Sequence, residues 1–311
     1  MEQPSGAEPD AAGTDRHTIV LITHNRRDEL MRTLAILHEL PDAGPIVVVD
    51  NASSDGTEAA VRSVWPRLRL IALERNLGAV GRNIAVRETT TPYVAFCDDD
   101  VWWSPGALTR AADLLDAHPR VATVTGRIIV EPGGEEDPIV PELRSSPVAP
   151  PDGVHVPGPV LGSILAGASM VRVDAFRAVG GFSQRLLLGG EEELLSADLT
   201  ATGHVLLYAD DVVVHHQASR LRDPSARRRA GIRNTLWFTW LRRPLGRALL
   251  RSARLLRTVP RDRTSALAVL DALSGLPGVL RDRRVLPTSA ERGLRALETT
   301  QLDSRARRYV G

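Results

Sequence analysis

The sequence contains no lysine and a single cysteine, and both scarcities restrict what the chain can do. All 39 basic side chains are arginines, a bias that fits genomic base composition better than a binding function. Because Cys97 has no partner within the chain, an intrachain disulfide is excluded and a reducing compartment fits. Cys97 lies in an apolar run, where thiols are poor nucleophiles, so we expect it to be inert packing.

Long apolar segments are absent as well. A membrane-spanning helix needs about 18 apolar residues in succession, and the best candidate, residues 159–171, is too short and too rich in glycine. Residues 1–16 are polar and lack an apolar core, which predicts a disordered tail and not a signal peptide. We therefore expect a cytoplasmic protein.

Acidic residues are scarce towards the C-terminus. Residues 218–311 contain 22 arginines and 7 acidic residues, a net +15, whereas the whole chain carries only +1. Within 233–263, apolar residues recur at helical spacing (Trp237, Trp240, Leu241, Leu245, Leu249), and arginines recur on another face (Arg243, Arg247, Arg251, Arg254). This pattern is typical of a helix that packs on a domain with a solvated basic face. It is also typical of a peripheral helix on the anionic inner face of a membrane. No nucleic-acid recognition motif accompanies it.

Four short apolar runs, rich in β-branched and aromatic residues, predict parallel strands that are covered on both faces. They lie at 18–22, 45–50, 68–73 and 93–97. Helical patterns separate them at 27–40, 55–65 and 79–88, with Ser54 or Asp55 as the expected N-cap of the second helix. A helix at 105–117 and strands at 121–130 and 204–216 follow. This order predicts an α/β fold with a doubly wound, mostly parallel sheet and a C-terminal helical extension.

Polar side chains follow each of the first four predicted strands. These stretches are Thr23–Arg26, Asp50–Gly56, Glu74–Gly78 and Asp98–Asp100. Ligands of open α/β sheets bind at the carboxyl ends of the strands. Four polar strand ends together therefore indicate a binding site.

Three adjacent carboxylates, Asp98, Asp99 and Asp100, repel one another unless something compensates their charge. They could form a solvated helix-capping turn, act as general acid and base, or hold a divalent cation. Mg²⁺ and Mn²⁺ prefer oxygen ligands and commonly bridge one or two carboxylates to substrate phosphates. The position at the end of a strand favours the metal site.

A second acidic cluster, Glu191, Glu192 and Glu193, follows two glycines. It could be an exposed helix start, where carboxylates suit the helix dipole, or it could supply a general base. His215 and His216 follow an apolar strand. Such histidines are usually structural, but beside a metal site one could supply a nitrogen ligand.

Taken together, these motifs resemble the inverting family 2 glycosyltransferases, which have a GT-A fold. The resemblance covers about residues 17–240 and rests on the order and spacing of THNR, VVDNASSDGT, ERNLGAVGRNIAV, FCDDDVWWSPGAL, GGEEELL and VVVHH. It implies a catalytic domain at 17–217, with a Rossmann-like nucleotide-sugar-binding half (17–103) and an acceptor half (104–217). The basic helical region at 218–311 would follow it.

The resemblance also implies roles for single residues. Donor-binding side chains would be Thr23, Asn25, Arg26, Asp50, Asp55, Arg82, Asn83, Asp98, Asp99 and Trp103. Mn²⁺ or Mg²⁺ would be held by Asp98 and Asp100, the Asp-x-Asp motif, and by His215, with His216 as the alternative. The base would be Glu192, with Glu191 as the alternative, because the family usually has Glu-Asp here. One tryptophan of Trp102–Trp103 would pack in the core and the other could stack on a sugar.

The expected activity is transfer of a hexosyl or deoxyhexosyl group from a nucleotide-diphosphate sugar to an acceptor hydroxyl, with inversion. A saccharide, a lipid-linked sugar of the cell envelope or a small molecule could be the acceptor. Residues 131–160, rich in proline and glycine, would contribute to its choice. Two alternatives stay open at this point: a sugar-1-phosphate nucleotidyltransferase and a non-catalytic nucleotide-sugar-binding protein.

Overall fold

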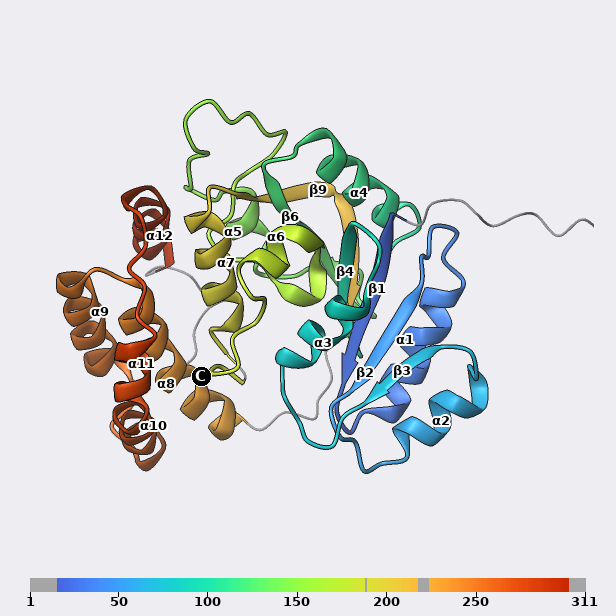
Figure 1. Ribbon diagram of the computed structural model, residues 1–311, viewed down its shortest axis with the longest axis horizontal. Coiled ribbons are helices and arrows are strands. Elements are labelled where there is room, and N and C mark those ends of the chain that lie inside the picture. Colours follow the sequence, from blue (N-terminus) through green and yellow to red (C-terminus); the bar gives the residue numbers. More distant parts are fainter. Residues whose placement is uncertain (1–15, 188, 218–223, 302–311) are drawn as a thin grey trace, which may run out of the picture.

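The computed structural model describes residues 16–187, 189–217 and 224–301 (Figure 1). The predicted tail falls outside this part of the chain except for Arg16, and so does the start of the basic region at 218–223. Four parallel strands form the first half of the sheet in the order β3-β2-β1-β4. They are β1 (His17–Thr23), β2 (Ile46–Asp50), β3 (Arg69–Ala72) and β4 (Tyr93–Asp98). The four predicted strands are confirmed.

Three helices connect these strands: α1 (Arg27–His38), α2 (Thr57–Val64) and α3 (Val80–Glu88). In α1, Leu30, Leu34 and Leu37 recur every three or four residues and are fully buried against the sheet. The N-cap residue of α2 is Gly56, with a backbone in the left-handed region, and not Ser54 or Asp55 as predicted. Asp55 still accepts a hydrogen bond from the backbone N–H of Thr57.

The second half of the sheet is mixed and not parallel, in the order β4-β8-β6-β9-β5. β8 (Ser169–Arg172) runs antiparallel to both neighbours, β6 (Val121–Val130) and β9 (Val205–His216) are parallel, and β5 (Val101–Trp103) is antiparallel to β9. The short β7 (Glu135–Glu136) pairs with β6. Because β5 pairs with the end of β9, the triple aspartate comes beside the two histidines.

The remaining elements of this half cover the sheet and carry the acidic cluster. They are α4 (Ala107–Ala117), α5 (Val140–Arg144), the 3-10 helix η1 (Ala166–Ala168), α6 (Val173–Ala178) and α7 (Glu191–Ala201). Glu191, Glu192 and Glu193 form the first turn of α7, where negative charge is favoured by the helix dipole.

The basic region forms a separate layer of helices at one side of the molecule (Figure 1). They are α8 (Pro224–Arg242), α9 (Leu245–Thr258), α10 (Arg263–Ser274), α11 (Leu276–Arg281) and α12 (Thr288–Gln301). The continuous helical pattern predicted at 233–263 is interrupted at Pro244, which precedes α9. Leu194 of α7 packs in one buried cluster with Phe238 and Leu241 of α8. Within the described residues, none of the helices has the length and hydropathy needed to cross a membrane.

Candidate active site

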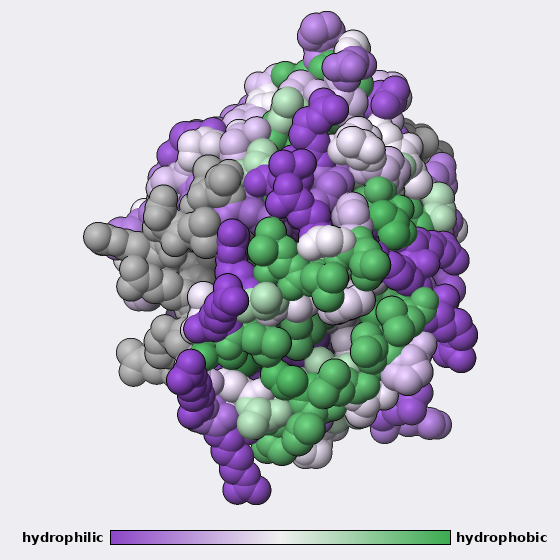
Figure 2. Space-filling view, turned by 90° about the vertical axis from the view of Figure 1, so that its left-hand side faces the viewer, coloured by the Kyte–Doolittle hydropathy of each residue, from purple (hydrophilic) through white to green (hydrophobic). Residues whose placement is uncertain are grey.

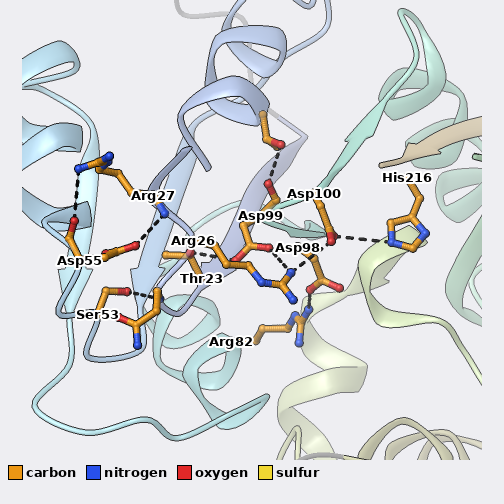
Figure 3. Close-up of polar contacts among 12 residues, drawn as sticks. Thr23, Arg26, Arg27, Ser53, Asp55, Arg82, Asp98, Asp99, Asp100 and His216 are labelled. Carbon is orange, nitrogen blue, oxygen red and sulfur yellow. Dashed lines mark hydrogen bonds and ion pairs between the residues drawn. The ribbon is translucent and has the colours of Figure 1, made fainter. Parts of the chain in front are cut away.

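The triple aspartate lies at the end of β4 and in the turn before β5, where Asp99 and Asp100 both contact Arg26 and Asp98 contacts Arg82 (Figure 3). Asp99 points into the protein and is only 4% exposed. It accepts hydrogen bonds from the Thr23 hydroxyl at 2.9 Å and from Arg26 Nη1 at 2.9 Å, and its carbonyl accepts one from Thr33 at 2.7 Å. Burial raises the pKa of Asp99 to about 7, although the adjacent Arg26 guanidinium favours ionisation. Asp99 thus anchors the turn, and the predicted contact with substrate is not supported.

Asp98 differs from Asp99 in its surroundings, whereas Asp100, also 4% exposed, shares with Asp99 the contact to Arg26. The Asp98 side chain is 42% exposed and forms an ion pair with Arg82. Asp100 Oδ2 lies 3.2 Å from Arg26 Nη1, and its Oδ1 lies 3.8 Å from His216 Nε2. Arg26 therefore faces the carboxylates, whereas we expected it in the nucleotide pocket.

The two histidines at the end of β9 have different surroundings. His215 Nδ1 lies 2.9 Å from Glu131 Oε1, His215 Nε2 lies 2.8 Å from Ser104 Oγ, and the ring stacks on Trp102. Successive side chains of a strand point to opposite faces, so His216 faces Asp100 and His215 does not. The structure thus favours His216, the alternative kept open by the sequence.

Trp103 is also corrected. It is fully buried in the main core, so it cannot stack on a sugar. Trp102, half-buried and stacked on the His215 ring with 5.6 Å between centroids, is the tryptophan nearer the surface. Cys97 is buried, and burial raises its thiol pKa to about 12, in agreement with an inert packing role.

Two loops at the ends of β1 and β2 are tied together. Asn25 Oδ1 accepts a hydrogen bond from Ser54 N at 2.7 Å, and Asp55 Oδ2 accepts one from Arg27 N at 2.9 Å. Asp50, 2% exposed, accepts a hydrogen bond from Ser53 N. Of the predicted donor pocket, Thr23, Asn25, Asp50 and Asp55 thus lie together, and they shape the loops through these contacts.

Arg82 and Asn83 lie side by side on α3 but do different things. Arg82, 5% exposed, reaches Asp98 and lies over the rings of Phe96 and Phe182. Asn83 donates a hydrogen bond to the Phe182 carbonyl at 2.8 Å and accepts one from the Phe182 N–H at 2.9 Å. Both ends of its amide thus bind within the protein, and its predicted contact with the donor stays a prediction.

Glu192 is linked to the aspartates through η1. Glu192 Oε1 accepts a hydrogen bond from the Ala166 N–H at 2.5 Å, and the next residue, Gly167, lies against Asp98, where an added Cβ would come within 3.0 Å of Asp98 Oδ2. Burial, together with the charge of Glu191, raises the pKa of Glu192 to about 7. A carboxylate with a pKa near neutrality suits a general base.

Glu191 and Glu193 have other surroundings. Burial raises the pKa of Glu191, whereas Glu193 forms an ion pair with Arg251 of α9 at 2.9 Å. Each successive residue of a helix is rotated by about 100°, so the three adjacent glutamates cannot share one environment. Glu192 is the one whose carboxylate binds η1.

The donor set fits a divalent ion that arrives with phosphates. Within the described residues, no three histidine, cysteine or acidic side chains converge into a complete metal cage. Mg²⁺ usually needs only one or two protein carboxylates, because substrate phosphates complete its coordination. Asp98 and Asp100, with His216 beside Asp100, can supply that share.

A cavity of about 420 Å³ lies between the catalytic part and the C-terminal helices. Asn83, the segment 179–185, Leu194 and Asp198 line one side, and α8, α11 and the segment after α11 line the other. Two carboxylates, Asp198 and Asp282, face six arginines: Arg87, Arg185, Arg242, Arg281, Arg283 and Arg284. The excess of positive charge favours an anionic ligand.

Some residues that hold the site together were not identified from the sequence. Thr33 binds the Asp99 carbonyl, and Asn51 binds Leu77 N and the Gly78 carbonyl. Ala166 and Gly167 join Glu192 to Asp98. The roles of these residues depend on contacts with residues distant in the sequence.

Comparison with known proteins gives consistent results. Residues 18–180 match the sequence profile described as Glycosyl transferase family 2. The chain is 30% identical over 289 residues to an N-acetylglucosaminyl-diphospho-decaprenol L-rhamnosyltransferase of Mycobacterium tuberculosis, covering 79% of this chain and 92% of that protein. It is 37% identical over 105 residues to the succinoglycan biosynthesis protein ExoO of Rhizobium meliloti, 32% of this chain and 30% of that one.

Solved structures share the fold at lower identity. The mannosyltransferase PcManGT from Pyrobaculum calidifontis, in complex with GDP-Man and Mn²⁺, superimposes with a TM-score of 0.56 at 21% identity, over 96% of this chain and 79% of that one. TarS residues 1–349 of S. aureus superimposes with a TM-score of 0.55 at 17% identity, over 86% of this chain and 90% of that one.

Proposed function

Because the chain belongs to glycosyl transferase family 2, it is a glycosyltransferase, and we propose that it transfers a deoxyhexose of the L-rhamnose class. The donor is a nucleotide-diphosphate sugar, and the acceptor is a hydroxyl of a polyprenyl-diphosphate-linked sugar. The rhamnosyltransferase that aligns along 92% of its own length supports both assignments. Family membership also makes the sugar-1-phosphate nucleotidyltransferase alternative untenable.

One observation carries this proposal: η1 joins the expected base to the expected donor site. Ala166 binds Glu192, while Gly167 leaves space for Asp98. An acceptor hydroxyl and the anomeric carbon of a donor must meet between these two groups. Direct attack from the face opposite the leaving group inverts the configuration.

Each residue then has a part in the transfer. Glu192 takes the proton from the acceptor hydroxyl as its oxygen bonds to the anomeric carbon. The bond from that carbon to the diphosphate oxygen breaks, and the nucleoside diphosphate leaves with the electron pair. Asp98, Asp100 and His216 would hold Mn²⁺ or Mg²⁺, which would supply positive charge that stabilises the leaving diphosphate. Arg82 keeps Asp98 in place.

The arginine-rich cavity supports a diphosphate-bearing acceptor. It adjoins Leu194 and Asp198 of α7, the helix whose first turn holds Glu192. Planar guanidinium groups bind phosphate through paired hydrogen bonds. We place the acceptor diphosphate in this cavity, with its sugar directed to the start of α7.

A thermal-shift panel tests the donor site. UDP, GDP and dTDP and their common sugars would each be added with Mn²⁺, Mg²⁺ or EDTA. A ligand that binds only the folded state raises its melting temperature, so we expect one nucleotide to do so only with metal. Asp100→Ala should abolish that shift while the protein without ligand melts normally.

Two outcomes would contradict the proposal. A folded protein that responds to no nucleotide with either metal does not have the donor site described above. A protein that binds a donor, but neither transfers its sugar to a polyprenyl-diphosphate-linked acceptor nor hydrolyses the donor, is the non-catalytic binding protein.

A further inference from the structure

The C-terminal helices carry an unusual concentration of exposed apolar side chains. Of the ten exposed large hydrophobic residues in the described part of the chain, eight lie between Leu245 and Val285. We name six of them the outer leucine face, each 46% to 60% exposed: Leu245, Leu249, Leu250 and Leu256 of α9, and Leu270 and Leu273 of α10. Figure 2 shows apolar side chains gathered over this side of the molecule, with hydrophilic side chains along the edges.

The sequence placed Leu245 and Leu249 on the apolar side of a helix that could pack on the domain or lie on a membrane. In α9, the side that faces the protein includes Ala248, which is fully buried, Arg251, which is paired with Glu193, and the half-buried Leu255. Arg243, just before α9, is 1% exposed and paired with Glu291 and Glu298 of α12. Because carboxylates of other helices hold these two arginines inside, α9 directs Leu245, Leu249 and Leu256 outward.

The outer side of α9 is amphipathic in its own right. Leu245, Leu249 and Leu256 follow helical spacing along one stripe. The neighbouring stripe consists of Leu250 and the exposed Arg254 and Arg257, four and seven residues further on. Apolar side chains next to guanidinium groups, on a helix that lies parallel to the surface, fit the boundary between lipid headgroups and acyl chains.

We propose that the outer leucine face docks on the surface of an anionic phospholipid bilayer, with its leucines below the headgroups and Arg254 and Arg257 among the phosphates. Charge selects this occupant. Residues 218–311 carry a net +15, so two copies meeting through this face would bring like charges together, whereas an anionic membrane would attract them. The docking is independent of sugar transfer, although it would place α7 near a lipid-linked acceptor.

Vesicle flotation of the full chain tests this directly, without donor or acceptor. We expect the protein to float with vesicles of phosphatidylcholine mixed with phosphatidylglycerol, and at least about tenfold less with phosphatidylcholine alone. Raising the salt concentration should weaken the binding, because exposed charges are screened. Replacing three leucines (Leu245→Gln, Leu249→Gln, Leu256→Gln) should reduce vesicle binding more than about tenfold, and Arg254→Gln with Arg257→Gln should remove the preference for anionic lipid.

Val64→Gln is the matched control, because Val64 is a 55% exposed apolar residue on α2, outside the face. It should float like the wild type. Circular dichroism and the single variant Leu249→Gln separate loss of binding from loss of folding. The proposal is overturned if the wild type ignores both kinds of vesicle, or if the triple variant binds as well as the wild type. A lipid-free dimer that the triple variant makes monomeric would overturn it too, in favour of a second copy. Failure of sugar transfer would leave the flotation result unaffected.

Discussion

At the scale of single residues, the site depends on small differences between adjacent like residues. Asp99 anchors its turn through Thr23 and Arg26. The Asp98 side chain is instead 42% exposed and forms an ion pair with Arg82. Glu192 binds η1, while Glu193 binds α9. In each case the direction of the Cα–Cβ bond decides which neighbours the side chain contacts.

The pH dependence should distinguish Glu192 from Glu191. A general base works only when ionised, and the pKa of Glu192 is raised to about 7. We therefore expect kcat/KM to fall as the pH is lowered through about 7, by about tenfold per unit below it. Glu192→Gln should lose about a hundredfold or more of kcat and also lose this pH dependence.

Glu191→Gln is the control for this experiment. Its negative charge raises the pKa of Glu192, so removing it should shift the acid limb to lower pH while most of kcat is kept. If Glu191→Gln is the inactive variant and Glu192→Gln retains turnover, the assignment of the base is wrong.

The two histidines should also separate experimentally. His216→Ala should raise the Mn²⁺ concentration needed for half-maximal activity by about tenfold or more, since a ligand is lost. His215→Ala should leave this concentration nearly unchanged. It should instead lower the free energy of unfolding by about 1–3 kcal/mol, because Glu131 and Ser104 lose a partner. Metal titrations of activity and urea denaturation measure the two effects, and the reverse pattern would restore His215 as the ligand.

At the scale of elements, α7 is held in place from both ends of its sequence. Its first turn reaches η1 through Glu192 and α9 through Glu193 and Arg251, and Asp198 is paired with Arg242 at the end of α8. The C-terminal helices therefore hold α7, the helix that carries Glu192, in place through these ion pairs.

Removing one of these ion pairs should affect turnover more than binding. Arg251→Met breaks the ion pair with Glu193, and we expect kcat to fall about tenfold with little change in KM for the donor. Glu193→Gln should reduce kcat less when Arg251→Met is already present than it does in the wild type, because both substitutions break the same contact.

Arg229→Met is the matched control at this scale, since Arg229 pairs with Asp271 between α8 and α10 at 2.6 Å. It should lower stability without changing kcat. Equal losses of kcat in Arg251→Met and Arg229→Met would show that the C-terminal helices act only through overall stability.

At the scale of the whole molecule, the arginine-lined cavity exists only because two regions of the chain meet. Asn83 and Leu194 belong to the catalytic part, whereas Arg281, Arg283 and Arg284 belong to the C-terminal region. The cavity also adjoins α11, next to the helices that carry the outer leucine face.

Arg284 tests the cavity as a diphosphate site. Because Arg284 is exposed and lines the cavity, Arg284→Gln should keep the fold and raise KM for a polyprenyl-diphosphate-linked acceptor about tenfold. The thermal shift with donor nucleotide should not change. Arg32→Gln, an exposed arginine on α1, is the control. An unchanged acceptor KM would place the acceptor diphosphate elsewhere.

The sequence by itself determined the α/β order, the strands at 18–22, 45–50, 68–73 and 93–97, and the family, because hydrophobic periodicity and the residues that end each strand are local properties. It also located the aspartates and the glutamates. The predicted roles of Asp50 and Asp55 at the nucleotide stay predictions.

Only the tertiary structure decided which member of each cluster is used. His216, and not His215, lies beside Asp100 because β9 pairs with β5 in this register. Trp103 is buried in the core, and Asn83 binds the backbone of Phe182; both depend on residues distant in the sequence. Leu245, Leu249 and Leu256 of α9 face outward because Glu193, Glu291 and Glu298 hold Arg251 and Arg243 inside. These outcomes depend on pairings between residues far apart in the chain, which local pattern does not encode.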